Sequence, residues 1–193
     1  MRLYVISRHG HSQLNLERVV NGDPSRPGPL TEQGQTMARF LGAQIRNIPF
    51  DVCVHTRFTR TRDTAQLALE GRDVPLEVEP LLDDVNVGEL EGLPIDRYRE
   101  IKAGLGRGSP FPGGESLDDA ARRYARAYRE LLARPWQSVL VVCHEIPLRY
   151  ALNAAGGSDD LDGPAHDIPN ATPFLFDEEA LERAAERIER LAS

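Results

Sequence analysis

The chain has 193 residues, of which 40% are hydrophobic and 27% are charged, as expected of one globular domain with a full-sized core. Its formal net charge of -7 argues against a general nucleic-acid-binding protein, which normally presents a basic surface. No apolar run approaches the roughly 18 to 20 residues of a membrane helix, and the N-terminal MRLYVISRHG becomes charged too early for a signal peptide. We therefore expect a cytoplasmic protein that binds neither nucleic acid nor membranes.

The predicted elements alternate between strands and helices. Short runs rich in Val, Leu and Ile are typical of strands buried on both faces of a parallel sheet, whereas apolar residues three or four positions apart indicate helices. In chain order we predict a strand over 2–7, a helix from its N-cap Thr31 to Ile45, a strand over 51–56, a helix over 59–69, a helix over 117–132 with Ser116 as N-cap, a strand over 138–143, a helix over 146–154, a strand over 172–176 and a C-terminal helix whose apolar face runs from Leu181 to Leu191.

Three clusters of Gly and Pro, at 21–30, 104–114 and 153–170, lie between these elements and are predicted to be surface loops. The pattern predicts an α/β fold, a three-layer α/β/α sandwich with a mostly parallel central sheet. Cys53 and Cys143 lie inside predicted strands, which indicates buried thiols rather than a disulfide framework. In such folds, ligands bind at the carboxyl ends of the strands.

Basic residues and histidines follow the predicted strands at those ends. Arg8 and His9 follow the first strand, with Asn15 shortly after, and His144 follows the strand over 138–143. The strand over 51–56 leads into RFTRTR at 57–62, which brings one of three arginines to the same edge. Arginine side chains offer forked donors and a fixed positive charge, so we expect these residues to surround one tetrahedral anion.

Several separate segments carry a resemblance to a known family. SRHGHSQLN resembles its Arg-His-Gly opening, NGDPSRPGPLTEQG its polar loop and helix start, TRFTRTRDTA its arginine motif, LLDDVNVGELEG its acidic stretch and VLVVCHEIPLRY its second histidine block, with PGGES at 112–116. The chain thus resembles the histidine phosphatase superfamily, in its phosphoglycerate mutase-like branch. The resemblance implies one catalytic domain over residues 1–193 with the phosphoglycerate mutase-like fold.

The family's site residues are transferred by motif position. The resemblance implies that His9 is the nucleophile that accepts the phosphoryl group, and that Arg8, Arg60 and His144 hold the phosphate oxygens with help from Asn15. Alignment on Thr64-Ala65 selects Arg60 over Arg57 and Arg62. The proton donor position, four residues before Gly88, is Asp84, and the design requires neither a metal nor a cofactor.

Two departures from the family pattern leave alternatives open. Many members have Glu at the donor position, so Asp83, Glu89 and Glu91 remain alternative acids to Asp84. Many members also have Gly after the second histidine, where this chain has Glu145. Glu145 either selects a cationic or hydroxylated substrate group or points away from the phosphate.

The predicted function is hydrolysis of a small phosphorylated metabolite through a phosphohistidine. A phosphoglycerate mutase is the second hypothesis. It ranks below hydrolysis because mutases usually carry longer insertions, for which 193 residues leave little room. A non-catalytic phosphate-binding protein is the third, and the lack of Gly-x-Gly-x-x-Gly after the first strand disfavours a dinucleotide-binding fold. The oligomeric state stays open, with a homodimer as one alternative.

Two further interpretations concern single side chains. His9-x-His11 is also how some metal-dependent hydrolases begin, but few further ligands follow, so we expect His11 at the pocket entrance or in solvent. The acidic loop residues Asp159, Asp160 and Asp162 would discourage highly anionic substrates if they face the entrance.

Overall fold

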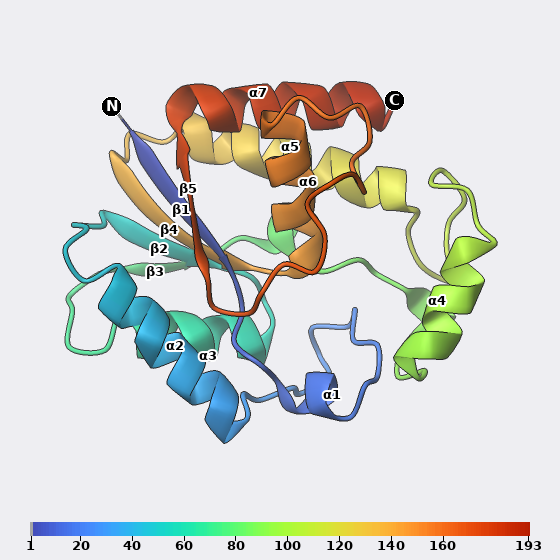
Figure 1. The fold of residues 1–193 in the computed structure, drawn as a ribbon, viewed down its shortest axis with the longest axis horizontal. Coiled ribbons are helices and arrows are strands. Elements are labelled where there is room, and N and C mark those ends of the chain that lie inside the picture. The colour runs from blue at the N-terminus through green and yellow to red at the C-terminus, as the bar shows by residue number, and fades with distance from the viewer. Residues whose placement is uncertain (1) are drawn as a thin grey trace.

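The computed structural model describes residues 2–193, and its centre is a five-stranded sheet (Figure 1). The strand order is β3-β2-β4-β1-β5. The strands are β1 (Leu3–Arg8), β2 (Val52–His55), β3 (Leu76–Val78), β4 (Ser138–Cys143) and β5 (Pro173–Asp177). The first four are mutually parallel and β5 pairs antiparallel with β1, which confirms the mostly parallel sheet.

Helices cover both faces of the sheet. On one face lie α2 (Glu32–Gln44) and α3 (Thr59–Ala68), and on the other lie α5 (Leu117–Ala133), α6 (Glu145–Ala155) and α7 (Glu178–Leu191) (Figure 1). A separate buried apolar cluster fills each interface, because alternate residues of β1 and β4 point to opposite faces. The predicted three-layer α/β/α sandwich is therefore confirmed.

The hydrogen bonds of the structure confirm the two predicted N-caps, Thr31 and Ser116. Thr31 Oγ1 accepts from the backbone N–H of Gly34 at the start of α2. Ser116 and Asp119 form a reciprocal capping box at the start of α5, where each side chain accepts from the other's backbone N–H. These local hydrogen bonds satisfy backbone donors that the first helical turn leaves free.

Three short elements are absent from the sequence prediction. They are the edge strand β3, the single-turn helix α1 (Gln13–Leu16) and helix α4 (Ile95–Ala103). All three residues of β3 are exposed, and α4 buries only Tyr98. Such elements carry little hydrophobic periodicity, since their neighbours in the fold determine them.

Two further sequence predictions concern the two cysteines and the presence of membrane-spanning helices. Cys53 and Cys143 are buried, unpaired residues of the central strands, as predicted. Among residues 2–193, no helix has the length and apolar character required to cross a bilayer.

Candidate active site

His9 and His144 come together because their strands are neighbours in register. Arg8, the last residue of β1, pairs with Cys143, the last residue of β4, and the backbone N–H of His9 donates to the carbonyl of Cys143 at 2.9 Å. Both histidines therefore leave the sheet at the same edge, with ring centroids 5.5 Å apart. Their side chains are buried, so any group bound between them is shielded from bulk water.

The His9 ring is held as a neutral imidazole with Nε2 unprotonated. Its Nδ1 lies 2.7 Å from the carbonyl oxygen of Gly10, which fixes the proton on Nδ1, and its Nε2 accepts a hydrogen bond from Arg60 Nε at 3.0 Å. Burial, and then the charges of Arg60 and Arg8, hold the pKa of His9 well below its ordinary value. An unprotonated Nε2 is the form of histidine that acts as a nucleophile.

Arg60 joins the components of the site. From the first turn of α3, its guanidinium reaches His9 Nε2, Asp84 Oδ2 at 3.1 Å and His144 Nδ1 at 3.1 Å. It also donates to the side chain and carbonyl of Asn21. Arg57 instead pairs with Asp83, and Arg62 pairs with Asp63. The structure thus separates the three arginines and brings Arg60 alone among them to the two histidines.

His144 is oriented by a threonine pair behind it. Its Nε2 lies 2.9 Å from Thr56 Oγ1, and Thr56 Oγ1 lies 2.8 Å from Thr61 Oγ1. A hydroxyl both donates and accepts, so Thr56 supports either tautomer of His144. Burial, followed by the charge of Arg60, holds the pKa of His144 well below its ordinary value.

Asp84 is the acid that faces this cluster. Its Oδ2 lies 3.1 Å from Arg60 Nη2 and 3.4 Å from His144 Nδ1. Burial raises the pKa of Asp84 despite the opposing charge of Arg60. A raised pKa increases the protonated fraction, which a proton donor requires.

The alternative acids lie elsewhere. Asp83 accepts from the backbone N–H and Nε of Arg57, and Glu91 accepts from the backbone N–H groups of Gly22 and Asp23. Neither lines the pocket that contains His9 and Asp84, and Glu89 does not line it either. Geometry therefore favours Asp84 among the four carboxylates considered.

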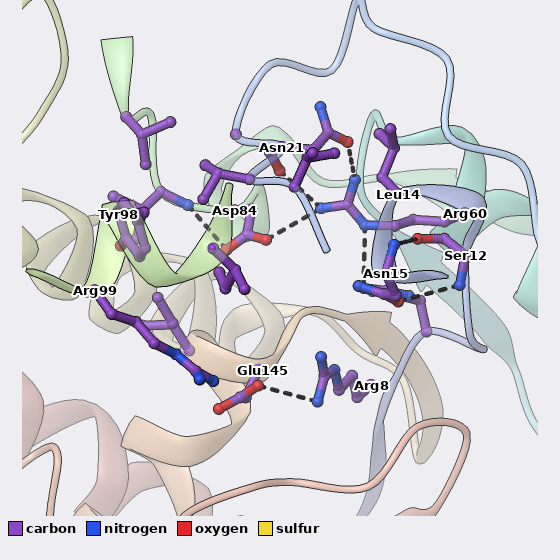
Figure 2. Close-up of a pocket in the computed structure, with 18 of the residues that line it drawn as sticks. Arg8, Ser12, Leu14, Asn15, Asn21, Arg60, Asp84, Tyr98, Arg99 and Glu145 are labelled. Carbon is purple, nitrogen blue, oxygen red and sulfur yellow. Dashed lines mark hydrogen bonds and ion pairs between the residues drawn. The ribbon is translucent and has the colours of Figure 1, made fainter. Parts of the chain in front are cut away.

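Arg8 and Glu145 form an ion pair across the opposite wall (Figure 2). Arg8 Nη1 lies 3.0 Å from Glu145 Oε2 and donates to the carbonyl oxygen of Ile168 at 2.7 Å, whereas its buried Nε has no hydrogen-bond partner. Glu145 also lies 3.5 Å from Arg149 Nη1. Glu145 thus does not point away: it lies in the pocket and engages a predicted phosphate ligand.

His9, Arg8, Arg60, Asp84 and Glu145 line one cavity of about 260 Å³. His144, which is fully buried and contacts Arg60, does not itself line this cavity. Asn15 also lines it, and its backbone N–H and side-chain oxygen form the cap of α1 with Ser12. A second part of the wall is apolar and consists of Leu14, Val19, Val20, Val85, Val87, Ile95, Tyr98 and Ile146. Arg99, Lys102 and Arg149 line the same cavity, so its wall combines apolar side chains with cations beyond Arg8 and Arg60.

Sequence reasoning missed three polar residues that hold the site. Asn21 accepts from Arg60, Thr56 contacts His144, and Thr64 Oγ1 donates to the carbonyl of Arg60 while it accepts from the backbone N–H of Gly10. Thr56 and Thr64 flank the arginine motif, which was the available signal. Asn21 lies in a loop whose course the sequence does not reveal.

His11 does not line the cavity, which corrects the expectation of a place at its entrance. Its Nδ1 lies 3.2 Å from Thr31 Oγ1, the N-cap of α2, and the ring is partly buried. Within residues 2–193, no group of three or more His, Cys, Asp or Glu side chains has the arrangement needed to hold a metal ion.

Two of the three acidic loop residues form ion pairs. Asp162 pairs with Arg107 and Arg149, and Asp159 pairs with Arg187. None of Asp159, Asp160 and Asp162 lines the cavity. Asp162 nevertheless pairs with Arg149, which does line it.

Known proteins similar to this chain include both mutases and phosphatases. A 2,3-bisphosphoglycerate-dependent phosphoglycerate mutase of Methylobacterium sp. (strain 4-46) is 34% identical over 192 residues, which are 91% of this chain and 90% of the mutase. The adenosylcobalamin/alpha-ribazole phosphatase of Salmonella typhimurium is 40% identical over 91 residues, 47% of this chain and 44% of the phosphatase. Because the chain covers nearly all of that mutase, length does not separate the two activities.

A solved structure and a family model agree on the fold. Bacillus stearothermophilus YhfR superposes with a TM-score of 0.79 over 91% of this chain and 90% of its own, at 22% identity. The family model of the histidine phosphatase superfamily (branch 1) matches residues 4–189. This chain therefore belongs to the histidine phosphatase superfamily, branch 1.

Proposed function

We propose that this protein is a phosphomonoesterase that hydrolyses a small phosphorylated metabolite through a phosphohistidine at His9. The observation that carries the proposal is the unprotonated Nε2 of His9, which faces Arg60 at 3.0 Å in a site that also holds Asp84. Arg60 thus contacts both the proposed nucleophile and the proposed acid. We infer no role for a metal or a cofactor in this design, because positioning and fixed charge supply most of phosphoryl transfer.

In the first step, His9 Nε2 attacks phosphorus as the ester P–O bond breaks. Arg60 exchanges its hydrogen bond with Nε2 for one with a phosphate oxygen, which frees the lone pair. Protonated Asp84 gives its proton to the leaving oxygen. The products of this step are phospho-His9, an alcohol and an Asp84 carboxylate.

In the second step, the Asp84 carboxylate takes a proton from water as the water oxygen attacks phosphorus. The P–N bond breaks, inorganic phosphate is released and Asp84 is protonated again. The charges of Arg8 and Arg60 stabilise the phosphate oxygens in both steps, and Asn15 assists them. His144 donates from Nδ1 to a phosphate oxygen once Thr56 donates to its Nε2.

The apolar wall supports a substrate whose body is partly hydrocarbon. The side chains of Leu14, Ile95 and Ile146 offer apolar contacts to such a body. Arg99, Lys102 and Arg149 also line the cavity, and they offer partners to a second anionic group such as the carboxylate of a phosphoglycerate. The lining therefore fits both a phosphatase substrate and a mutase substrate, and the assay of the two activities separates them.

A mutase remains the second candidate because of the 34% identical relative that bears that name. The two activities differ in what accepts the phosphoryl group from His9: water in a phosphatase, a substrate hydroxyl in a mutase. Steady release of inorganic phosphate from phenyl phosphate, set against conversion of 3-phosphoglycerate with its bisphosphate present, distinguishes them.

The first test compares wild type with His9→Ala on p-nitrophenyl phosphate, with a chelator present. We expect wild-type turnover, its persistence in chelator, and a loss of at least about 10³-fold in kcat/KM for His9→Ala, because no other nucleophile is available. The His11→Ala variant is the matched control and is expected to retain most activity. Absence of turnover in wild type would contradict the proposal and favour either a selective mutase or a phosphate-binding protein without catalysis, which the 3-phosphoglycerate assay separates.

A second test assigns the acid with two esters of similar shape. Phenolate is a stronger base than p-nitrophenolate, so phenyl phosphate depends more on a proton donor. We expect Asp84→Asn to lower kcat/KM for phenyl phosphate about 10²-fold and for p-nitrophenyl phosphate less than about tenfold. In wild type, kcat/KM for phenyl phosphate divided by that for p-nitrophenyl phosphate is expected to fall with rising pH, because Asp84 ionises. In Asp84→Asn the same ratio is expected to stay constant. Equal losses on both esters would contradict the assignment.

A further inference from the structure

The segment that carries Asp84 has little regular structure of its own. A single 3-10 turn at Pro80–Leu82 precedes it, and Asp83 follows with backbone angles near polyproline II (φ -54°, ψ 153°). Asp83 faces Arg57 while Asp84 faces the cavity. A small rotation or slip of this segment would therefore move Asp84 out of the site.

Arg123 of α5, which does not line the cavity, donates hydrogen bonds to the backbone carbonyl groups of this segment. Its Nη1 donates to the carbonyl oxygens of Leu81 at 2.7 Å and Asp83 at 2.9 Å, and its Nη2 donates to that of Asp84 at 3.3 Å. Carbonyl groups on both sides of the Asp83–Asp84 peptide link are thus held by one rigid guanidinium.

Glu115 contacts both Arg123 and the backbone that follows Asp84. It forms a two-point ion pair with Arg123, at 2.6 Å and 3.3 Å, and its Oε1 accepts from the backbone N–H of Asn86 at 2.8 Å. Both side chains are about one-fifth exposed, and the Arg123 guanidinium lies 4.8 Å from the centre of the Tyr124 ring. The backbone is held before and after Asp84, which restrains the direction of its Cα–Cβ bond.

We propose that Arg123 is a positioning residue that aims Asp84, rather than Asp83, at the leaving oxygen of the substrate. The inference rests on the proposed function, because it gives Arg123 a purpose only if Asp84 is the acid. Arg123 does not line the cavity that holds His9; it acts through the backbone of Leu81, Asp83 and Asp84. Lysine at this position keeps the charge but not the planar fork that spans several carbonyls.

The test measures kcat/KM of Arg123→Lys for phenyl phosphate and p-nitrophenyl phosphate. We expect a loss of about tenfold or more for phenyl phosphate and less than about threefold for p-nitrophenyl phosphate, since only the former depends strongly on the acid. The ratio of the two rates does not depend on how much of the variant is folded. Arg126→Lys, one turn further along α5 in an exposed pair with Glu130, is the matched control and is expected to leave the ratio unchanged.

A double variant shows whether Arg123 acts through Asp84. If it does, Asp84→Asn/Arg123→Lys turns over phenyl phosphate within about twofold of Asp84→Asn alone, because the group that Arg123 positions is already absent. Glu115→Gln weakens the same contacts and is expected to shift the ester ratio in the same direction by a smaller factor.

Two failures are distinguishable. If Asp84→Asn lowers phenyl phosphate turnover selectively but Arg123→Lys changes both esters equally, or neither, the positioning role is overturned and the acid assignment stands. If Asp84→Asn itself fails to discriminate between the esters, the acid assignment falls and the positioning role falls with it. Full additivity of the two substitutions on phenyl phosphate would also overturn the inference.

Discussion

At the scale of single residues, the position after His144 distinguishes this site. Glu145 places a carboxylate 3.0 Å from Arg8, which is also a proposed ligand of the phosphate. A phosphate bound to Arg8 would therefore share this arginine with Glu145 and lie near a second negative charge. Arg149, 3.5 Å from Glu145, offers the carboxylate another partner. We expect this arrangement to weaken phosphate binding and to favour release of the product.

We expect Glu145→Gln to bind inorganic phosphate about three- to tenfold more tightly, because it removes both the competitor for Arg8 and the repulsion. Calorimetric titration of the wild type and the variant at neutral pH gives the two dissociation constants. Glu130→Gln, which removes an exposed charge paired with Arg126 on α5, is the control. Unchanged or weaker binding by Glu145→Gln would contradict this account.

At the scale of elements, the first turn of α2 lies against the segment that follows β1. A Cβ atom on Gly34 would lie 2.0 Å from the carbonyl oxygen of His11, and one on Gly10 would lie 2.6 Å from the carbonyl oxygen of Gly34. Both obstacles are backbone atoms, which move only if an element shifts. The close approach of α2 therefore fixes the backbone that carries His9.

We expect Gly34→Ala to lower the free energy of unfolding by about 1–3 kcal/mol, although alanine is the better helix former, because the overlap outweighs the propensity. It is also expected to lower kcat/KM on p-nitrophenyl phosphate through displacement of His9. Urea unfolding measures the first effect. Gly104→Ala is the control, since its Cβ would meet nothing closer than 3.5 Å; equal stability of the two variants would contradict the prediction.

At the scale of the whole molecule, folding buries two histidines as neutral rings. The pKa values of His9 and His144 lie well below the ordinary value in the folded protein, chiefly because of burial. The unfolded chain therefore binds more protons than the folded one once the pH falls below about 6.5. The stability from these groups is fully present above that pH and is lost as the pH falls.

We expect the free energy of unfolding to drop by about 3 kcal/mol between pH 7.5 and pH 5.5, because each of the two histidines contributes about 1.4 kcal/mol over this interval. Urea unfolding at the two pH values measures the drop, and His144→Asn is expected to reduce it by about half. His166→Asn, which removes an exposed imidazole, serves as control. A stability that is constant or rises toward pH 5.5 would refute the argument.

Local patterns in the sequence specify the layers of the fold and the types of group at the site. The apolar runs that became β1, β2 and β4, the caps Thr31 and Ser116 and the histidines at two strand ends are encoded locally, by period, cap chemistry and order along the chain. The family resemblance added the roles of these residues and the selection of Arg60.

Which side chains meet depends instead on contacts between distant parts of the chain. Asp84 faces the cavity and Asp83 does not, and Glu145 pairs with Arg8. Arg123 binds a loop about 40 residues earlier in the chain. Each of these contacts joins segments that are distant in the sequence. The edge strand β3 and helix α4 likewise depend on neighbours rather than on their own patterns. Local sequence sets the conformation of a segment, but long-range packing sets the direction in which each side chain points, and the chemistry of this site depends on direction.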